Sequence, residues 1–217
     1  MANKNMDIIL FGMQGSGKGT QGRYLAEKNG LTIFEMGGQL RQIIESDSPL
    51  GEKIKGIVQA GNLVDDDTIM EVVKNFLSFL SGEKAVLFDG IPRTVAQSEK
   101  LLDLLAKYQR DAFAVLIKIS EDEAIKRLTQ RRVCEGCKGV YPPSYKADTC
   151  EHCGGQLVVR HDDNLESIQR RLENYKNETL PVINSFYERD RLIEVDGEQS
   201  IEKVTKEMFE KVDYLFT

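Results

Sequence analysis

Short apolar runs alternate with amphipathic segments along most of the chain. Residues 7–11 form an apolar run that ends at Gly12, and a run of this length followed by glycine predicts a buried parallel strand. Residues 19–29 space their apolar positions at helical intervals, and Gly30 follows where helices commonly end. The pattern therefore predicts a strand, a glycine-rich loop and a helix.

The same pattern returns three times further along the chain. Residues 85–88 precede Asp89-Gly90, residues 113–119 precede a helical segment at 121–130, and residues 192–195 precede Asp196-Gly197. Short apolar strands that alternate with helices indicate an α/β fold with crossover connections. We therefore expect one parallel sheet flanked by helices.

Two stretches interrupt this alternation and predict inserted lobes. Residues 35–64 have the pattern of short helices punctuated by glycine and proline, which indicates a small helical lobe. Residues 133–163 contain all four cysteines and two short β-like pieces, which indicates a second lobe. The expected division is a core of residues 1–34, 65–129 and 164–217, with lobes at 35–64 and 130–163.

Composition and charge narrow the classes of protein. A chain of 217 residues can bury one main core, and 41% apolar with 29% charged residues is typical of soluble globular proteins. The apolar runs are too short to span a bilayer, and residues 1–7 lack the apolar region of a signal peptide. The net charge of −6 disfavours a general nucleic-acid coat, so a cytoplasmic protein without nucleic-acid or membrane partners is expected.

Residues 12–20, Gly-Met-Gln-Gly-Ser-Gly-Lys-Gly-Thr, join the first predicted strand to the first predicted helix. Glycines let backbone N–H groups surround phosphate oxygens, the helix N-terminus adds positive potential, and a lysine reaches the β and γ oxygens. A glycine-rich turn with a chance lysine is the alternative, but the flanking strand and helix favour a nucleoside triphosphate. Gly19 separates Lys18 from Thr20, which departs from the usual Lys-Ser/Thr order and disfavours the usual magnesium ligand at that position.

All four cysteines fall in two pairs, Cys134-x-x-Cys137 and Cys150-x-x-Cys153, twelve residues apart. Two such pairs can place four thiolates tetrahedrally around Zn²⁺, and a closed site of this kind indicates a structural ion. Disulfides are the alternative, which the expected reducing compartment disfavours. Four thiolates also accept iron or cobalt, so the ligand set is predicted more firmly than the metal.

Two motifs resemble signatures of the adenylate kinase family. They are the loop at residues 12–20 continued by Gln21, and the segment Phe-Asp-Gly-Ile-Pro-Arg-Thr at 88–94 followed by Gln97. The resemblance runs from residue 8 to 204 and includes the four-cysteine lid of many bacterial forms. It implies a P-loop monomer that reversibly transfers a phosphoryl group from Mg-ATP to AMP, giving two ADP, with residues 35–64 as the monophosphate-binding lobe and residues 130–163 as a zinc-binding lid.

The resemblance also implies roles for individual residues. The ATP site would contain Gly15, Ser16, Gly17, Lys18, Gly19, Thr20, Arg127, Arg131, Val140, Tyr141 and Gln199. The AMP site would contain Met36, Arg41, Asn62, Leu63, Val64, Gly90, Arg93, Gln97, Arg160 and Arg171. The catalytic cations would be Lys18, Arg93, Arg131, Arg160 and Arg171. Asp89, with Asp162 or Asp163, would organise magnesium through water.

The segment 35–41, Glu-Met-Gly-Gly-Gln-Leu-Arg, departs from the family pattern. Met36 occupies the place of a threonine and Gly38 that of an aspartate, which leaves open a kinase for another nucleoside monophosphate. Gln97 favours adenine, because its amide both donates and accepts as the adenine edge requires. A P-loop nucleotide switch with a zinc-ribbon lobe for a partner is a further alternative, and the acidic balance disfavours it.

Overall fold

A five-stranded parallel sheet forms the centre of the computed structural model, which describes residues 6–46, 48–80, 84–143, 145–159 and 163–216. The strands follow the order β2-β3-β1-β4-β8 across the sheet. Their bounds are β1 Met6–Phe11, β2 Thr32–Glu35, β3 Val86–Asp89, β4 Asp111–Lys118 and β8 Leu192–Asp196. The sequence predicted four of these strands; it missed β2, an edge strand of four residues in which only Phe34 is buried.

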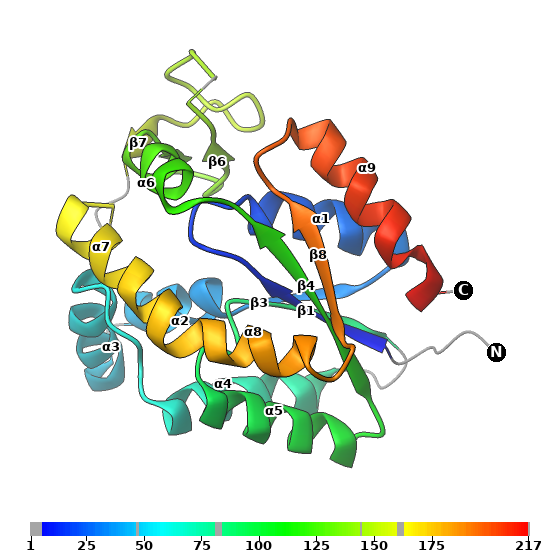
Figure 1. Ribbon diagram of the computed structural model, residues 1–217. Coiled ribbons are helices and arrows are strands. Elements are labelled where there is room, and N and C mark those ends of the chain that lie inside the picture. The colour runs from blue at the N-terminus through cyan, green and yellow to red at the C-terminus, as the bar shows by residue number, and fades with distance from the viewer. Residues whose placement is uncertain (1–5, 47, 81–83, 144, 160–162, 217) are drawn as a thin grey trace.

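Helices cover both faces of the sheet, as Figure 1 shows, with α1 and α9 on one face and α4, α5 and α8 on the other. Their bounds are α1 Lys18–Asn29, α4 Asp66–Phe79, α5 Val95–Lys107, α6 Glu121–Thr129, α7 Leu165–Asn174, α8 Leu180–Tyr187 and α9 Ile201–Val212. A π-helical turn, Tyr175–Thr179, joins α7 to α8, and a 3₁₀ turn, Asp213–Leu215, follows α9. The prediction of an α/β fold with a parallel sheet flanked by helices is confirmed.

Alternate residues of β1 face opposite layers of the core. Ile8 and Leu10 lie in the cluster that includes Met208 of α9, whereas Ile9 and Phe11 lie in the cluster that includes Leu101 of α5. A strand buried on both faces needs apolar side chains at consecutive positions, which explains the continuous apolar run in the sequence.

Two smaller units project from this core. Helices α2 Met36–Glu45 and α3 Pro49–Gln59 pack against each other within the predicted helical lobe. The cysteine segment forms a second, antiparallel sheet in the order β6-β5-β7, with β5 Arg132–Cys134, β6 Val140–Tyr141 and β7 Leu157–Val159. Within the described ranges, no helix combines the length and the apolar character that crossing a membrane requires.

A buried ion pair joins three strands at the amino-terminal edge of the sheet. Arg110 donates from Nε to Asp7 Oδ2 at 2.8 Å and from Nη2 to Asp7 Oδ1 at 2.5 Å. The exposed fractions of the two side chains are 3% and 0%. The backbone N–H of Val86 also donates to Asp7 Oδ1, and Arg110 donates to the Lys84 carbonyl. The pair therefore fixes the starts of β1, β3 and β4 relative to one another.

We expect Asp7→Asn to lower the free energy of unfolding by about 3–5 kcal/mol, because it leaves the Arg110 guanidinium buried without a counter-charge. Urea unfolding at neutral pH measures this. The matched control is Asp213→Asn, which removes the exposed Lys28–Asp213 pair and costs about 1 kcal/mol or less. Equal losses in the two variants would contradict a structural role for the buried pair.

Candidate active site

The carboxyl ends of the central strands bring the predicted motifs to one edge of the sheet. The loop after β1 lies between the end of β3, which carries Asp89, and the end of β4, because β1 pairs with both strands. Ligands of open parallel sheets bind at this edge, where neighbouring strands lead into crossovers of opposite direction. The site is therefore positioned by strand order, and its side chains come from distant segments.

The loop after β1 leaves backbone donors available for an anion. Helix α1 begins at Lys18 without a side-chain cap on its first turn and without an acidic residue there. The Ser16 hydroxyl is buried and has no hydrogen-bond partner among the described residues. Free N–H groups at a helix N-terminus attract anions, and the orphaned hydroxyl is a further donor. The loop therefore has the chemistry of a phosphate cradle.

Gly12 is required by the close packing of this loop. A Cβ at this position would lie 2.5 Å from Ser16 Oγ and 2.6 Å from the Ile117 carbonyl oxygen. The Lys18 ammonium donates to the Gly12 and Met13 carbonyls at 2.7 and 2.9 Å. The lysine is thus held against the loop that it would share with phosphate oxygens.

Four of the predicted catalytic cations affect one another electrostatically. The pKa of Lys18 is lowered to about 8, mainly by loss of solvent; the charge of Asp89 opposes this shift, while those of Arg93 and Arg131 add to it. Burial also lowers the pKa of Arg93, and the positive charge of Arg171 adds to this effect. Lys18 of the phosphate loop and Arg93, which follows β3, are therefore both affected by the charges of other predicted catalytic cations.

Asp163 holds two of these arginines. Arg131 donates from Nε and Nη2 to the two carboxylate oxygens at 2.8 and 2.7 Å, and Arg171 donates to Oδ1 at 3.1 Å. The Asp163 side chain has no exposed surface. The sequence suggested Asp163 as a magnesium-organising group, whereas the structure pairs it with guanidinium groups. Arg160 and Asp162 lie outside the described residues.

Asp89, at the end of β3, acts electrostatically on Lys18 of the phosphate loop. Burial raises the pKa of this carboxyl group, and the positive charges of Lys18, Arg93 and Arg41 act in the opposite direction. A partly buried carboxylate with little access to solvent is a suitable partner for a hydrated cation. Asp89 therefore fits the magnesium-organising role that the sequence suggested.

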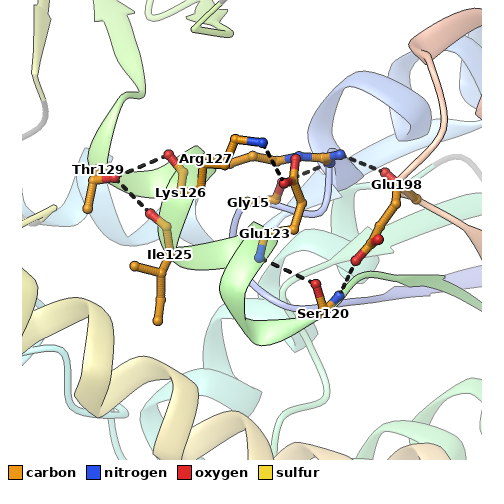
Figure 2. Close-up of polar contacts among 9 residues, drawn as sticks. Gly15, Ser120, Glu123, Ile125, Lys126, Arg127, Thr129 and Glu198 are labelled. Carbon is orange, nitrogen blue, oxygen red and sulfur yellow. Dashed lines mark hydrogen bonds and ion pairs between the residues drawn. The ribbon is translucent and has the colours of Figure 1, made fainter.

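Arg127 links the phosphate loop to the turn after β8, as Figure 2 shows. Its Nε donates to Glu123 at 2.8 Å, Nη1 to the Gly15 carbonyl at 3.4 Å and Nη2 to the Gly197 carbonyl at 3.0 Å. The position between these two turns is compatible with stacking on a nucleotide base. Glu123, four residues earlier on α6, could have been found from helical spacing alone.

Three other residues of the predicted ATP site lie further from this arrangement. The Gln199 amide donates to Glu207 of α9 at 2.5 Å and to the Asp196 carbonyl at 3.3 Å. Tyr141 is buried in the cysteine lobe, where its hydroxyl lies 3.0 Å from Cys150 Sγ, while Val140 is 44% exposed. The structure therefore brings Arg127, but not these three side chains, onto the phosphate loop.

Arg93 and Gln97 are joined on the other side of the site. The Gln97 side-chain oxygen accepts from the Arg93 backbone N–H at 2.7 Å, and its nitrogen donates to Asp66 at 2.7 Å. The Arg93 guanidinium donates to the Gly90 carbonyl at 3.0 Å. No sequence pattern pointed to Asp66, which lies 31 residues before Gln97 and meets it through the packing of α4 against α5.

The structure offers a physical reason why the sequence of residues 35–41 differs from the family pattern. Glu35 binds Arg41 at 2.9 Å, so a carboxylate from outside the usual position pairs with this arginine. A Cβ on Gly38 would lie 3.2 Å from Glu35 Oε2, closer than ordinary contacts. Met36 is 2% exposed and belongs to the core cluster, next to Gly90. Glycine at 38 therefore makes room for the Glu35 carboxylate.

The three residues between α3 and α4 that the sequence assigned to the AMP site differ in burial. Val64 is buried in the core cluster, Leu63 is partly buried and Asn62 is exposed. Two side chains of α7 form hydrogen bonds with the preceding turn: Arg170 donates to the Ala60 carbonyl, and Asn174 donates to the Gly61 carbonyl. This segment therefore connects the helical lobe to the core next to Arg171.

The four cysteine sulfur atoms converge within the second lobe. All four lie within 4.8 Å of one another, and none is in a disulfide. Zinc–thiolate bonds of about 2.3 Å in a tetrahedron separate sulfur atoms by about 3.8 Å, so the donor set fits Zn²⁺. The hydrogen bond from Tyr141 lowers the pKa of Cys150 to about 6, which favours the thiolate that a metal needs.

The cysteine lobe has little core of its own. Its buried apolar cluster consists of Cys134, Tyr141, Cys150 and Leu157, so two of its four members are metal-ligand candidates. A lobe with so little apolar burial depends on metal binding for its fold, as small zinc domains do. The four converging cysteines are therefore compatible with a closed structural site for Zn²⁺.

Comparison with known proteins identifies relatives that match almost the whole chain. The sequence model of the adenylate kinase family matches residues 10–191. A protein of Archaeoglobus fulgidus named adenylate kinase is 36% identical over 208 residues, which cover 94% of this chain and 96% of the relative. The adenylate kinases of Thermosipho melanesiensis and Pelobacter propionicus are 37% and 38% identical, covering 94% and 92% of this chain and 97% and 93% of their own.

Chelation under reducing conditions should unfold the cysteine lobe and leave the sheet core folded, because the metal supplies most of that lobe's folding free energy, roughly 10 kcal/mol in isolated zinc domains. Calorimetry before and after metal removal should show a lower first transition and a retained core transition. Elemental analysis should give one metal ion per chain before chelation and none afterwards. An unchanged melting curve after confirmed removal would contradict this dependence.

Proposed function

The chain belongs to the adenylate kinase family, and we propose that the residues at the carboxyl edge of its sheet carry out that family's reaction on AMP. The protein is an enzyme that transfers a phosphoryl group between ATP and AMP. The pairing of Arg131 and Arg171 on the buried Asp163 carboxylate carries the assignment of roles to residues. Neither a nucleotide switch nor a kinase of another class is favoured by the relatives.

Phosphoryl transfer requires two nucleotides in line and positive charge around the moving group. The loop at residues 12–20 binds the triphosphate of ATP through its backbone donors and Lys18. Arg41 and Arg93 hold the phosphate of AMP, and Arg131 and Arg171 stabilise the charge between the two nucleotides, with Arg160 as a further cation. Arginine suits this role because it stays protonated and grips oxygens in pairs.

Before substrate binds, the arginines proposed to contact the substrate phosphates form ion pairs with carboxylates of the protein. Arg131 and Arg171 share Asp163, and Arg41 is paired with Glu35. Substrate phosphates would take over these hydrogen bonds, so the cations need little reorganisation of solvent during transfer.

Magnesium bound with ATP neutralises charge on the β and γ oxygens and helps to orient them. The Asp89 carboxylate would organise this ion through water, since Mg²⁺ retains much of its hydration shell in nucleotide sites. Zinc would be held by Cys134, Cys137, Cys150 and Cys153 as a structural ion.

Residues 35–64 and 130–163 are, in this proposal, the two lobes that close over the substrates. Closure excludes water, so that AMP and not hydroxide accepts the phosphoryl group. In this proposal the enzyme acts as a monomer, as its membership of the family implies. The thiolates of the metal centre require a reducing compartment, which supports the cytoplasm.

The test of the proposed reaction is a coupled assay of Mg-ATP with AMP, GMP, CMP and UMP, which follows diphosphate formation. We expect ADP formation with AMP at a kcat/KM well above that of the other three. Lys18→Met should lower kcat about 10²–10³-fold, because it removes a positive charge from the transferring group. Preference for another monophosphate would reassign the acceptor, and activity unaffected by Lys18→Met would contradict the assigned site.

Glu35→Gln should lower the KM for AMP up to about fivefold, because Arg41 no longer has to leave an ion pair worth about 1 kcal/mol or less. The KM for ATP should not change. Glu52→Gln is the matched control, since it removes the exposed Lys55–Glu52 pair of the same lobe. A KM for AMP that stays constant or rises in Glu35→Gln would show that this pair does not hold Arg41 away from substrate.

A further inference from the structure

Both the oxygen and the nitrogen of the Gln97 side-chain amide form hydrogen bonds. The residue lies in the first turn of α5 with 2% of its surface exposed. Its oxygen accepts from the Arg93 backbone N–H and its nitrogen donates to Asp66 Oδ1, each at 2.7 Å. Asp66 is in turn held by the Thr94 hydroxyl, which lies 3.2 and 3.1 Å from its two oxygens.

These partners allow only one orientation of the amide. A backbone N–H can only donate, and an ionised carboxylate can only accept. Rotating the Gln97 amide by 180° would set its NH₂ group against the Arg93 N–H and its oxygen against the Asp66 carboxylate. Two hydrogen bonds would be lost, and like groups would face each other in a buried place.

The orientation of the amide decides which base edge it can recognise. One N–H and one oxygen lone pair of Gln97 have no partner among the described residues, which leaves a single donor and acceptor pair. Adenine offers a donor at its 6-amino group and an acceptor at N1, whereas a 6-oxopurine offers an acceptor at position 6 and a donor at N1. A freely rotating amide could serve either edge by turning over.

We propose that Asp66 is a specificity-determining positioning residue, which locks the Gln97 amide so that the acceptor site takes 6-aminopurine and rejects 6-oxopurine monophosphates. This inference rests on the proposed function, because that function places Gln97 at the acceptor base. Asp66 acts through Gln97 and has no part in the transfer itself. Its side chain belongs to α4, so the packing of α4 against α5 sets the base selectivity.

The variant Asp66→Asn tests the lock without changing the size of the side chain. Its amide can turn to offer Gln97 either an oxygen or an NH₂ group, which leaves only the Arg93 N–H to oppose rotation. The probes are AMP and inosine monophosphate, which differ in the donor and acceptor order of the edge and otherwise have nearly the same shape. We expect the ratio of kcat/KM for AMP to that for inosine monophosphate to fall about tenfold, as loss of one charge-assisted hydrogen bond predicts.

Asp67→Asn is the matched control. It removes the same charge from the same first turn of α4, but Asp67 is 91% exposed and pairs with Lys100. Its ratio of kcat/KM values should equal that of the wild type. The KM for ATP should stay constant in both variants, and Asp66→Ser, whose hydroxyl both donates and accepts, repeats the test if Asp66→Asn folds poorly.

Gln97→Ala separates positioning from a general structural effect. If Asp66 acts through Gln97, then adding Asp66→Asn to Gln97→Ala should not change the ratio further. The inference would be overturned if Asp66→Asn changed the ratio further in the Gln97→Ala variant, or if Asp66→Asn alone left the ratio unchanged. Either result would leave the proposed function as an AMP kinase standing. A wild-type enzyme that uses both monophosphates equally would instead overturn the proposed adenine specificity and this inference with it.

Discussion

The mutual repulsion of the cations at the carboxyl edge of the sheet is the constraint on which the site depends. The charges of Arg93 and Arg131 act to lower the pKa of Lys18, and the charge of Arg171 acts to lower the pKa of Arg93. Such a group is stable without substrate only if protein acceptors hold each member. Asp163 takes two of the arginines, and carbonyl groups of the phosphate loop take the lysine. Substrate phosphates would therefore exchange one set of acceptors for another, without ordering free side chains.

A carboxylate also holds Arg41 in the unusual segment 35–41, which includes the first turns of α2. The family pattern has an aspartate where this chain has Gly38, and in this chain Arg41 pairs with a different carboxylate. Glu35 supplies one from three residues earlier, and the missing Cβ of Gly38 makes room for it. Met36 packs into the core, so the hydroxyl of the usual threonine is replaced by apolar packing. The sequence of residues 35–41 thus changes the groups around Arg41, while Arg41 itself is retained.

Different forces hold the two projecting units. Helices α2 and α3 pack against each other and join the main apolar cluster, which includes Met36 and Ile54. Among its described residues, the cysteine lobe has an apolar cluster of four buried residues, and its four cysteine sulfur atoms lie within 4.8 Å of one another.

The sequence by itself determined the parallel sheet, the phosphate loop and the four-sulfur ligand set. Each depends on residues that are near one another in the chain, where apolar runs, glycine spacing and cysteine spacing act directly through local geometry. The pairing of Glu123 with Arg127 is of the same local kind.

The tertiary structure alone decided which acidic group holds each of the other cations and amides. Asp163 meets Arg131, Asp66 meets Gln97, and Asp7 meets Arg110 across separations of 32, 31 and 103 residues. Strand order and helix packing bring these partners together, and neither leaves a periodic trace at the residues concerned. The sequence therefore specified the chemistry that the site contains, and the packing of the core specified how that chemistry is oriented.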